Sequence, residues 1–236
     1  MRNYIILNDK DSRYLDGFIV QALPPISKPK IRTQVEEIDG RDGDLVTSLG
    51  YSAYDKTLKI GLYGNYRIDD IISYFDSSGV VTFSNEIDKF YRYQIVDQID
   101  FERLVRFRTA TVKFHVQPFK YSRVETKKVF TIDRDDVTSV GVRNSGNTIA
   151  RPIITIEGEG SVSLYLNDKN AFTIAFGEDR SITIDTEKME AYNGNILKNR
   201  HVAGDYDNFA LNVGLNTISW SGKITKITLE NYTRWI

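Results

Sequence analysis

The chain has 236 residues, and its 31 lysines and arginines nearly balance its 32 aspartates and glutamates. This balance argues against a protein whose main task is to neutralise nucleic-acid phosphates or an anionic membrane surface. The sequence has no cysteine, which excludes a disulfide framework, a thiolate metal site and a cysteine nucleophile. No stretch approaches the roughly 18 apolar residues of a membrane span. Residues 1–15 lack the apolar region of a signal peptide. We therefore expect no membrane segment and synthesis in the cytoplasm.

The first 64 residues predict strands separated by irregular segments. A short strand is predicted over 4–7, and the prolines within 24–29 mark an extended stretch. Residues 30–38 predict a weak strand and residues 57–64 a stronger one. Residues 39–52 lie between these two and are rich in glycine and charge, which predicts a long loop or an exposed hairpin tip.

Residues 65–79 interrupt the strand rhythm and predict the one helix of the chain. Its apolar residues recur at the helical spacing i, i+3, i+4 and i+7, namely Ile68, Ile71, Ile72 and Phe75. We expect Asn65 to cap this helix and Gly79 to end it.

The apolar pattern changes parity between residues 105 and 116. Val105 and Phe107 fall on one face, whereas the alternate residues from Ala110 to Val116 fall on the other. Such a switch predicts a bulge near Arg108, or two strands joined there.

The second half of the chain alternates apolar and polar residues over 153–160, 161–168, 171–176 and 181–192, with turn residues between the runs. Two further strands, Asn216 to Trp220 and Lys223 to Leu229, are predicted to form a hairpin through Ser221-Gly222. The short, regularly spaced strands are typical of a sandwich or jelly roll. A boundary near residue 124 would divide the chain into domains 1–124 and 125–236, both mainly β.

Catalytic motifs are hard to assemble from this sequence. No G-x-S-x-G elbow and no phosphate-binding glycine motif occurs. We expect His115 and His201 to be surface residues, and we expect no catalytic residues, metal or cofactor. Trp220 and Trp235 are the candidates for stacking on a sugar ring, although Trp220 alternates with Ile218 in a pattern that favours the core.

Four segments, taken together and in order, resemble the distal tail protein (Dit) family of long, non-contractile-tailed phages of Gram-positive hosts. They are IDGRDGDLV at 38–46, a helix-and-strand segment at 68–101, TVKFHVQPFKY at 111–121, and residues 204–235. The resemblance spans nearly the whole chain.

This resemblance implies a virion structural protein at the distal end of the tail, the baseplate hub, rather than an enzyme. It implies an N-terminal β-sandwich domain that forms a hexameric ring around a channel, followed by a C-terminal galectin-like β-sandwich. The ring, single or stacked with a second, would join the tail tube protein to the tail-associated tip protein, carry receptor-binding proteins, and let DNA pass without specific binding.

The charged loop is the candidate oligomer interface. Asp39, Arg41, Asp42 and Asp44 would reach from one protomer to the next, with Arg41 pairing against an acid, because a ring needs head-to-tail contacts that close. A merely solvated hairpin tip is the competing interpretation. For the whole protein, the alternatives are a carbohydrate-binding tail module that contacts the host cell wall and, third, a wall-degrading glycosidase.

Overall fold

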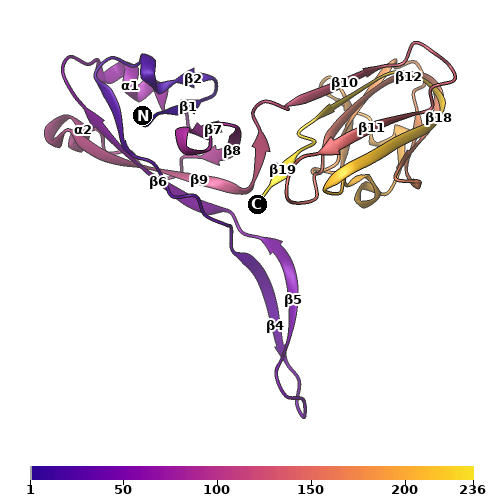
Figure 1. The fold of residues 1–236 in the computed structure, drawn as a ribbon, viewed down its shortest axis with the longest axis horizontal. Helices are drawn as coiled ribbons and strands as arrows, with labels where there is room; N and C mark the ends of the chain where they lie inside the picture. The colour runs from indigo at the N-terminus through magenta and orange to yellow at the C-terminus, as the bar shows by residue number, and fades with distance from the viewer. Residues whose placement is uncertain (1) are drawn as a thin grey trace. The chain divides into compact units, whose positions relative to one another are not determined.

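The computed structural model describes residues 2–236, and its internal contacts divide the chain into two compact units. The N-terminal unit extends to Lys120, and the C-terminal unit takes in Tyr121–Trp235. Both units are built mainly from β-strands, which confirms the predicted fold class (Figure 1).

The N-terminal unit is built on a sheet whose strands lie in the order β2-β1-β7-β8-β9-β6-β3. These strands are β1 (Ile5–Leu7), β2 (Lys10–Asp11), β3 (Phe18–Ala22), β6 (Tyr54–Leu62), β7 (Ser78–Phe83), β8 (Lys89–Gln94) and β9 (Thr109–Ser122). Alternate residues of β6 and β9, such as Leu58 and Val112, point into one apolar core because side chains alternate across a strand. Two α-helices, α1 (Ile68–Tyr74) and α2 (Phe101–Phe107), belong to the same unit.

Helix α1 is shorter than predicted. It is capped by Arg67 without a side-chain hydrogen bond, so the predicted Asn65 cap is wrong. It ends at Tyr74, and Gly79 lies in β7 with φ of 144°, so Gly79 does not terminate the helix either. The apolar stripe is real, because Ile71 is 1% exposed and packs into the core.

The parity change near residue 108 marks the end of a second helix, which the sequence pattern did not predict. Asp100 accepts a hydrogen bond from the Arg103 amide at 2.7 Å and so caps α2. Arg108 has φ of 57°, the left-handed conformation that commonly closes a helix, and β9 begins at the next residue. The expected bulge or strand junction is therefore a helix-to-strand transition.

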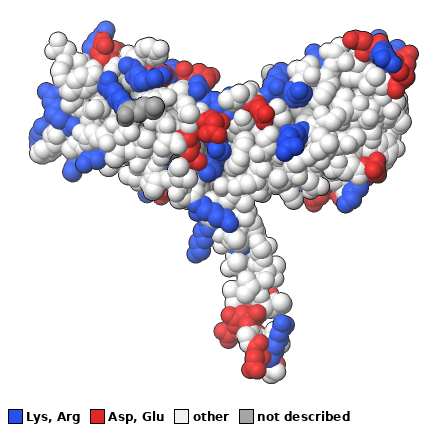
Figure 2. Space-filling view, in the orientation of Figure 1, with Lys and Arg blue, Asp and Glu red and all other residues white. Residues whose placement is uncertain are grey.

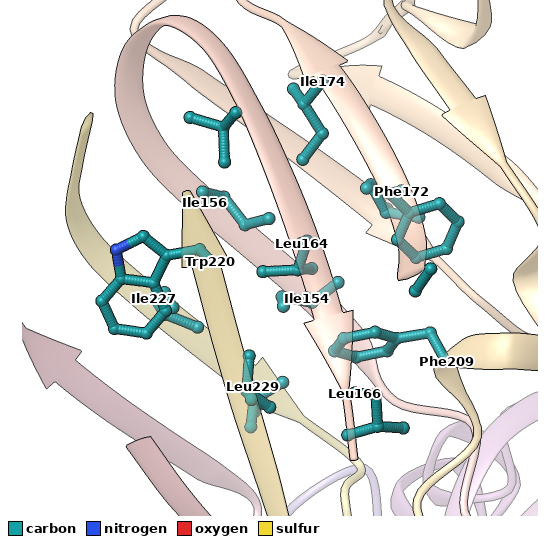
Figure 3. Packing of buried hydrophobic residues seen from close by; sticks show 14 of the residues in the cluster. Ile154, Ile156, Leu164, Leu166, Phe172, Ile174, Phe209, Trp220, Ile227 and Leu229 are labelled. Carbon is teal, nitrogen blue, oxygen red and sulfur yellow. The ribbon is translucent and has the colours of Figure 1, made fainter. Parts of the chain in front are cut away.

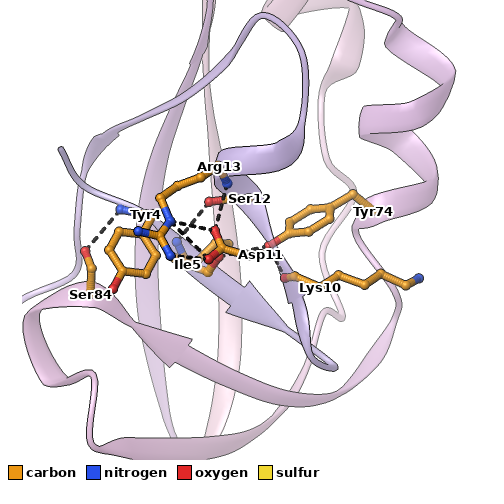
Figure 4. A network of polar contacts seen from close by, with 8 residues as sticks. All are labelled: Tyr4, Ile5, Lys10, Asp11, Ser12, Arg13, Tyr74 and Ser84. Atoms are coloured by element: carbon orange, nitrogen blue, oxygen red, sulfur yellow. Dashed lines mark hydrogen bonds and ion pairs between the residues drawn. The ribbon is translucent and has the colours of Figure 1, made fainter.

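Side-chain hydrogen bonds fix the N-terminal strands to α1 (Figure 4). The Tyr74 hydroxyl donates to the carbonyl oxygens of Ile5 at 3.2 Å and Lys10 at 3.0 Å. The Ser12 hydroxyl accepts a hydrogen bond from the Ile5 amide at 3.0 Å. Burial raises the pKa of the Tyr74 hydroxyl above its ordinary value. These contacts tie the short β1–β2 hairpin to α1 and to the segment that follows β2.

The C-terminal unit is a second antiparallel β-structure, centred on two long strands, β12 (Ile153–Leu166) and β18 (Gly214–Glu230). The other strands of its sheet are β10 (Lys127–Thr131), β11 (Ser139–Asn144), β13 (Lys169–Ala175), β14 (Ser181–Asp185), β15 (Glu190–Asn193), β16 (Ile196–Leu197) and β17 (Val202–Gly204). The short strand β19 (Arg234–Trp235) pairs with β9 instead. Inward residues of the long strands, among them Leu164 and Ile227, pack with Phe172 and Phe209 into one core (Figure 3).

Two predicted turns in this unit are wrong, because each lies within a continuous strand. Gly158 and Gly160 lie inside β12, and Ser221-Gly222 lies inside β18. The register between the two strands shifts at Glu157/Gly158 and between Glu159 and Ser163. Gly222 has φ of 96°, and a Cβ there would lie 2.4 Å from the Ser161 carbonyl oxygen. The glycines therefore mark facing bulges that bend both strands together.

Candidate assembly interface

A two-stranded ribbon, residues 31–51, forms a sheet of its own in the N-terminal unit, and we call it the arm (Figure 1). It consists of β4 (Ile31–Glu37) and β5 (Asp44–Tyr51), paired antiparallel with Val35 opposite Val46. The expected long loop over 39–52 is thus mostly strand, and the exposed-hairpin alternative is correct.

The arm has no core, because every residue from 30 to 50 is exposed. Six apolar side chains on it expose between 41% and 58% of their surface: Ile31, Val35, Ile38, Leu45, Val46 and Leu49. An isolated two-stranded hairpin is marginally stable in water at best. An exposed ribbon that carries this many apolar residues is typical of a surface that another chain covers.

The arm tip, residues 36–44, carries the predicted interface residues. Five of its residues are acidic and one, Arg41, is basic, and Figure 2 shows the red side chains gathered at this end. The structure brings Asp39, Arg41, Asp42 and Asp44 together. Within residues 2–236, the Arg41 side chain makes no ion pair, and its amide donates to the Ile38 carbonyl oxygen at 3.1 Å. The acid partner that was predicted for Arg41 would therefore lie on another chain.

Side chains of the N-terminal unit anchor the root of the arm. Residues 23–30, which we call the strap, lead into the arm without strand pairing. Asn85 donates to the Pro24 carbonyl oxygen at 3.0 Å, and Lys56 donates to that of Pro25 at 2.9 Å. On the return side, the Ser52 amide donates to the Lys30 carbonyl oxygen at 2.8 Å. The strap is therefore fixed although its prolines have no amide proton to give.

Lys56 belongs to a buried ionic cluster beneath the strap. The Glu86 carboxylate accepts from Lys120 at 2.9 Å and from the Tyr91 hydroxyl, and these three residues and Lys56 are each less than 10% exposed. Burial lowers the pKa of Lys56 to about 8, with Glu86 opposing this shift and Lys120 adding to it. Burial and the bond to Glu86 raise the pKa of Tyr91.

This cluster was not predicted from the sequence, although strand parity gave a signal for it. Lys56 shares its face with Leu58 and Ile60, and Lys120 shares its face with Phe114 and Val116. A lysine at an inward position is costly to bury unless an acid accompanies it. Two such lysines on paired strands therefore call for a buried carboxylate nearby, which Glu86 supplies.

The other candidate residues lie elsewhere. Trp220 is 6% exposed and packs in the C-terminal core, as its alternation with Ile218 predicted. This burial disfavours stacking of Trp220 on a sugar ring, a role that stays a prediction. Trp235 is partly exposed in β19. His115 Nδ1 lies 2.8 Å from Asp55 Oδ1 on the surface, and His201 Nδ1 lies 2.9 Å from the Ala175 carbonyl oxygen.

Residues 2–236 offer neither a metal-binding cluster nor a membrane-spanning helix. No group of three or more histidine, aspartate or glutamate side chains in this range could hold a metal ion. No helix in it has the length and apolar character to cross a bilayer.

Comparison with known proteins gives a family match and similar folds. Residues 12–116 match the family described as the phage tail protein RIFT-related domain. The crystal structure of the Dit protein (gp 19.1) of phage SPP1, described as a paradigm of the hub adsorption apparatus in phages that infect Gram-positive bacteria, has 16% identity. It superposes with a TM-score of 0.68, and the match covers 100% of both chains.

A chain of the phage P2 baseplate, solved in its activated conformation with Ca, has 10% identity and a TM-score of 0.54. That match covers 100% of this chain and 98% of the P2 chain. No curated protein matches the sequence. The arm lies inside the family match. Residues 12–116 are similar to the phage tail RIFT-related domain, and the whole chain has a fold similar to that of SPP1 Dit, which agrees with the predicted resemblance to distal tail proteins.

Proposed function

We propose that the protein is the hub adaptor at the distal end of a phage tail, with a structural rather than a catalytic role. The phage tail domain at 12–116 and the fold shared with SPP1 Dit over the full chain support this role. The N-terminal unit would form a hexameric ring, and the C-terminal unit, the predicted galectin-like domain, would lie outside it. The ring would join the tail tube protein to tail-tip and receptor-binding proteins.

The exposed arm is the observation that carries the proposal. A ribbon with six exposed apolar side chains and an acidic tip needs a covering surface, and a neighbouring copy in a ring supplies one for every arm. A head-to-tail contact that repeats around a closed ring leaves no arm uncovered. The near-neutral net charge of the chain suits a channel that DNA must leave freely.

The test is the mass of the full chain in solution, measured by light scattering after gel filtration over a range of concentrations. The proposal expects a species of six chains that shows a channel by electron microscopy. As a matched pair, Val46→Asp in the arm should disrupt the ring, whereas Asp69→Asn on α1 should leave it intact. A chain that stays monomeric at every concentration, with or without tail tube protein, would contradict the ring.

The lectin-like alternative has its own test. Saturable binding of the full chain to cell-wall saccharide, abolished by Trp235→Ala, would support it. The burial of Trp220 makes this function the weaker of the two.

A further inference from the structure

The outward surface of α2 combines arginines with exposed apolar side chains. We call the exposed residues of this segment the α2 surface: Glu102, Arg103, Val105, Arg106, Phe107 and Arg108. Phe107 is 64% exposed, which is unusual for a phenylalanine of a folded domain. Arginine and aromatic residues are the side chains most enriched at the centres of protein interfaces.

The helix presents these residues from a fixed position. Leu104 is 0% exposed and anchors the inner face of α2, while Asp100 caps its first turn. Arg103, Arg106 and Phe107 are spaced i, i+3 and i+4, so they lie on one face of the helix. Arg106 pairs with Glu102 at 2.9 Å, whereas in the described chain the Arg103 guanidinium makes no hydrogen bond or ion pair.

The arm tip and the α2 surface are complementary in charge and in apolar content. The tip has five acids and one arginine, and residues 101–108 have three arginines and one glutamate. Ile38 and Leu45 lie beside the acids of the tip, as Phe107 and Val105 lie beside the arginines of α2. Complementary charges favour and orient encounter, and apolar contacts between them supply affinity.

The two surfaces do not meet within one chain, because all residues from 30 to 50 are exposed. Each copy therefore exposes one acidic tip and one basic helix that its own chain leaves uncovered, the arrangement that a head-to-tail contact requires. We propose that the occupant of the α2 surface is the arm tip of a second copy of this chain. This inference rests on the proposed ring and adds the site at which each arm docks.

Cross-linking between single-cysteine chains tests docking of the arm tip on α2 directly, because the native sequence has no cysteine to interfere. Full-length Asp42→Cys and Arg103→Cys chains are mixed and treated with a short bis-maleimide. We expect a two-chain adduct in the mixture well above either chain alone. The matched control replaces Arg103→Cys by Asp69→Cys on α1, where we expect no adduct above background.

Charge reversal supplies the second measurement. We expect Asp42→Arg with Asp44→Arg, or Arg103→Glu with Arg106→Glu, to raise the concentration for half-assembly about tenfold. The four changes combined in one chain should restore assembly, because the charges again oppose each other. Circular dichroism of each variant checks that the chain is folded.

The possible outcomes distinguish failure of the α2 docking site from failure of the proposed ring. Two results would overturn docking on α2 and leave the proposed ring intact. One is a six-chain species without cross-links to α2, and the other is a combined variant that assembles no better than either charge-reversed pair. A chain that neither assembles nor cross-links at any concentration overturns both.

Discussion

The arm and the β12–β18 pair are both long antiparallel ladders, yet they differ in what lies on their faces. The facing residues Leu164 and Trp220 of the long pair are buried in the C-terminal core, whereas the facing Val35 and Val46 of the arm are exposed. Strand pairing alone is therefore not a measure of stability in this protein. The long pair is held along its length by packing, and the arm is held at its root by side chains from the N-terminal unit.

The first prediction removes the ionic support beneath the root of the arm. Glu86→Gln deletes the only carboxylate among Lys120, Lys56 and Tyr91 in that buried cluster, leaving buried ammonium groups without a negative partner. We expect a loss of about 3–5 kcal/mol in the free energy of unfolding, measured by urea denaturation. The exposed pair Lys113–Asp55 provides the control, because Asp55→Asn should cost less than about 1 kcal/mol. Equal losses would mean that burial does not decide the strength of these pairs.

The second prediction compares glycines of positive φ in the two ladders. Gly222→Ala brings a methyl group to 2.4 Å from the Ser161 carbonyl oxygen, whereas nothing lies within 4 Å of a Cβ at Gly43. We expect Gly222→Ala to destabilise the chain by about 3 kcal/mol and Gly43→Ala by about 1 kcal/mol, the cost of the backbone conformation alone. Thermal unfolding of the two variants measures the difference. Similar melting temperatures would show that the facing bulges can relax.

The third prediction uses one substitution on both ladders. Val162→Thr places a hydroxyl in the C-terminal core, where Val162 is 0% exposed, and should cost about 1–3 kcal/mol. Val46→Thr changes an exposed position and should alter the unfolding free energy of the separate chain by less than about 0.5 kcal/mol. If a second copy covers the arm as proposed, Val46→Thr should still weaken association. If Val46→Thr destabilises the unassembled chain as much as Val162→Thr, the arm packs on its own unit.

The fourth prediction concerns the pH dependence of stability, and its expected effect per pH unit is the smallest of the four. The pKa of Lys56 is about 8 in the folded chain against an ordinary 10.5, so only the unfolded chain keeps this proton between those values. Stability should therefore rise with pH over that window, by up to about 1 kcal/mol per pH unit. Below pH 8 both states are protonated and the cost of burying the charge is fully present.

Comparing the wild type with Lys56→Met isolates this contribution, because tyrosines that titrate at higher pH are common to both chains. The difference in unfolding free energy between the two should grow in favour of the wild type from pH 8 to 10. A constant difference would place the pKa of Lys56 at its ordinary value.

The sequence predicted most strands but misjudged where they end. Alternation located β12, β13, β14 and β18, and glycines then suggested turns that the structure replaces with bulges. A glycine of positive φ serves a turn and a bulge equally well, and only the facing strand decides between them. Helix α2 was missed because Val105 and Phe107 also fit an alternating strand, although Asp100 offered a capping signal.

The candidate interface was partly predictable for a related reason. Asp39, Asp42 and Asp44 stand out as a charged, glycine-bordered tip whatever the surrounding structure is. The exposure of Val35, Val46 and their neighbours was not predictable, because alternating apolar residues in a strand normally point into a core. Only the fold shows that no core lies beneath them.

The strap also has a consequence for how arms of different length can arise. Because Asn85 and Lys56 hold the carbonyl oxygens of Pro24 and Pro25, we expect the N-terminal unit to tolerate changes in the length of the chain between Lys30 and Ser52. Adding two residues to each strand of the arm would extend its reach by about 7 Å while keeping every side chain on its original face. Insertion of a single residue would turn the distal part over. Homologous arms should therefore vary in steps of two residues per strand, a pattern that aligned sequences would display as paired insertions before and after the tip.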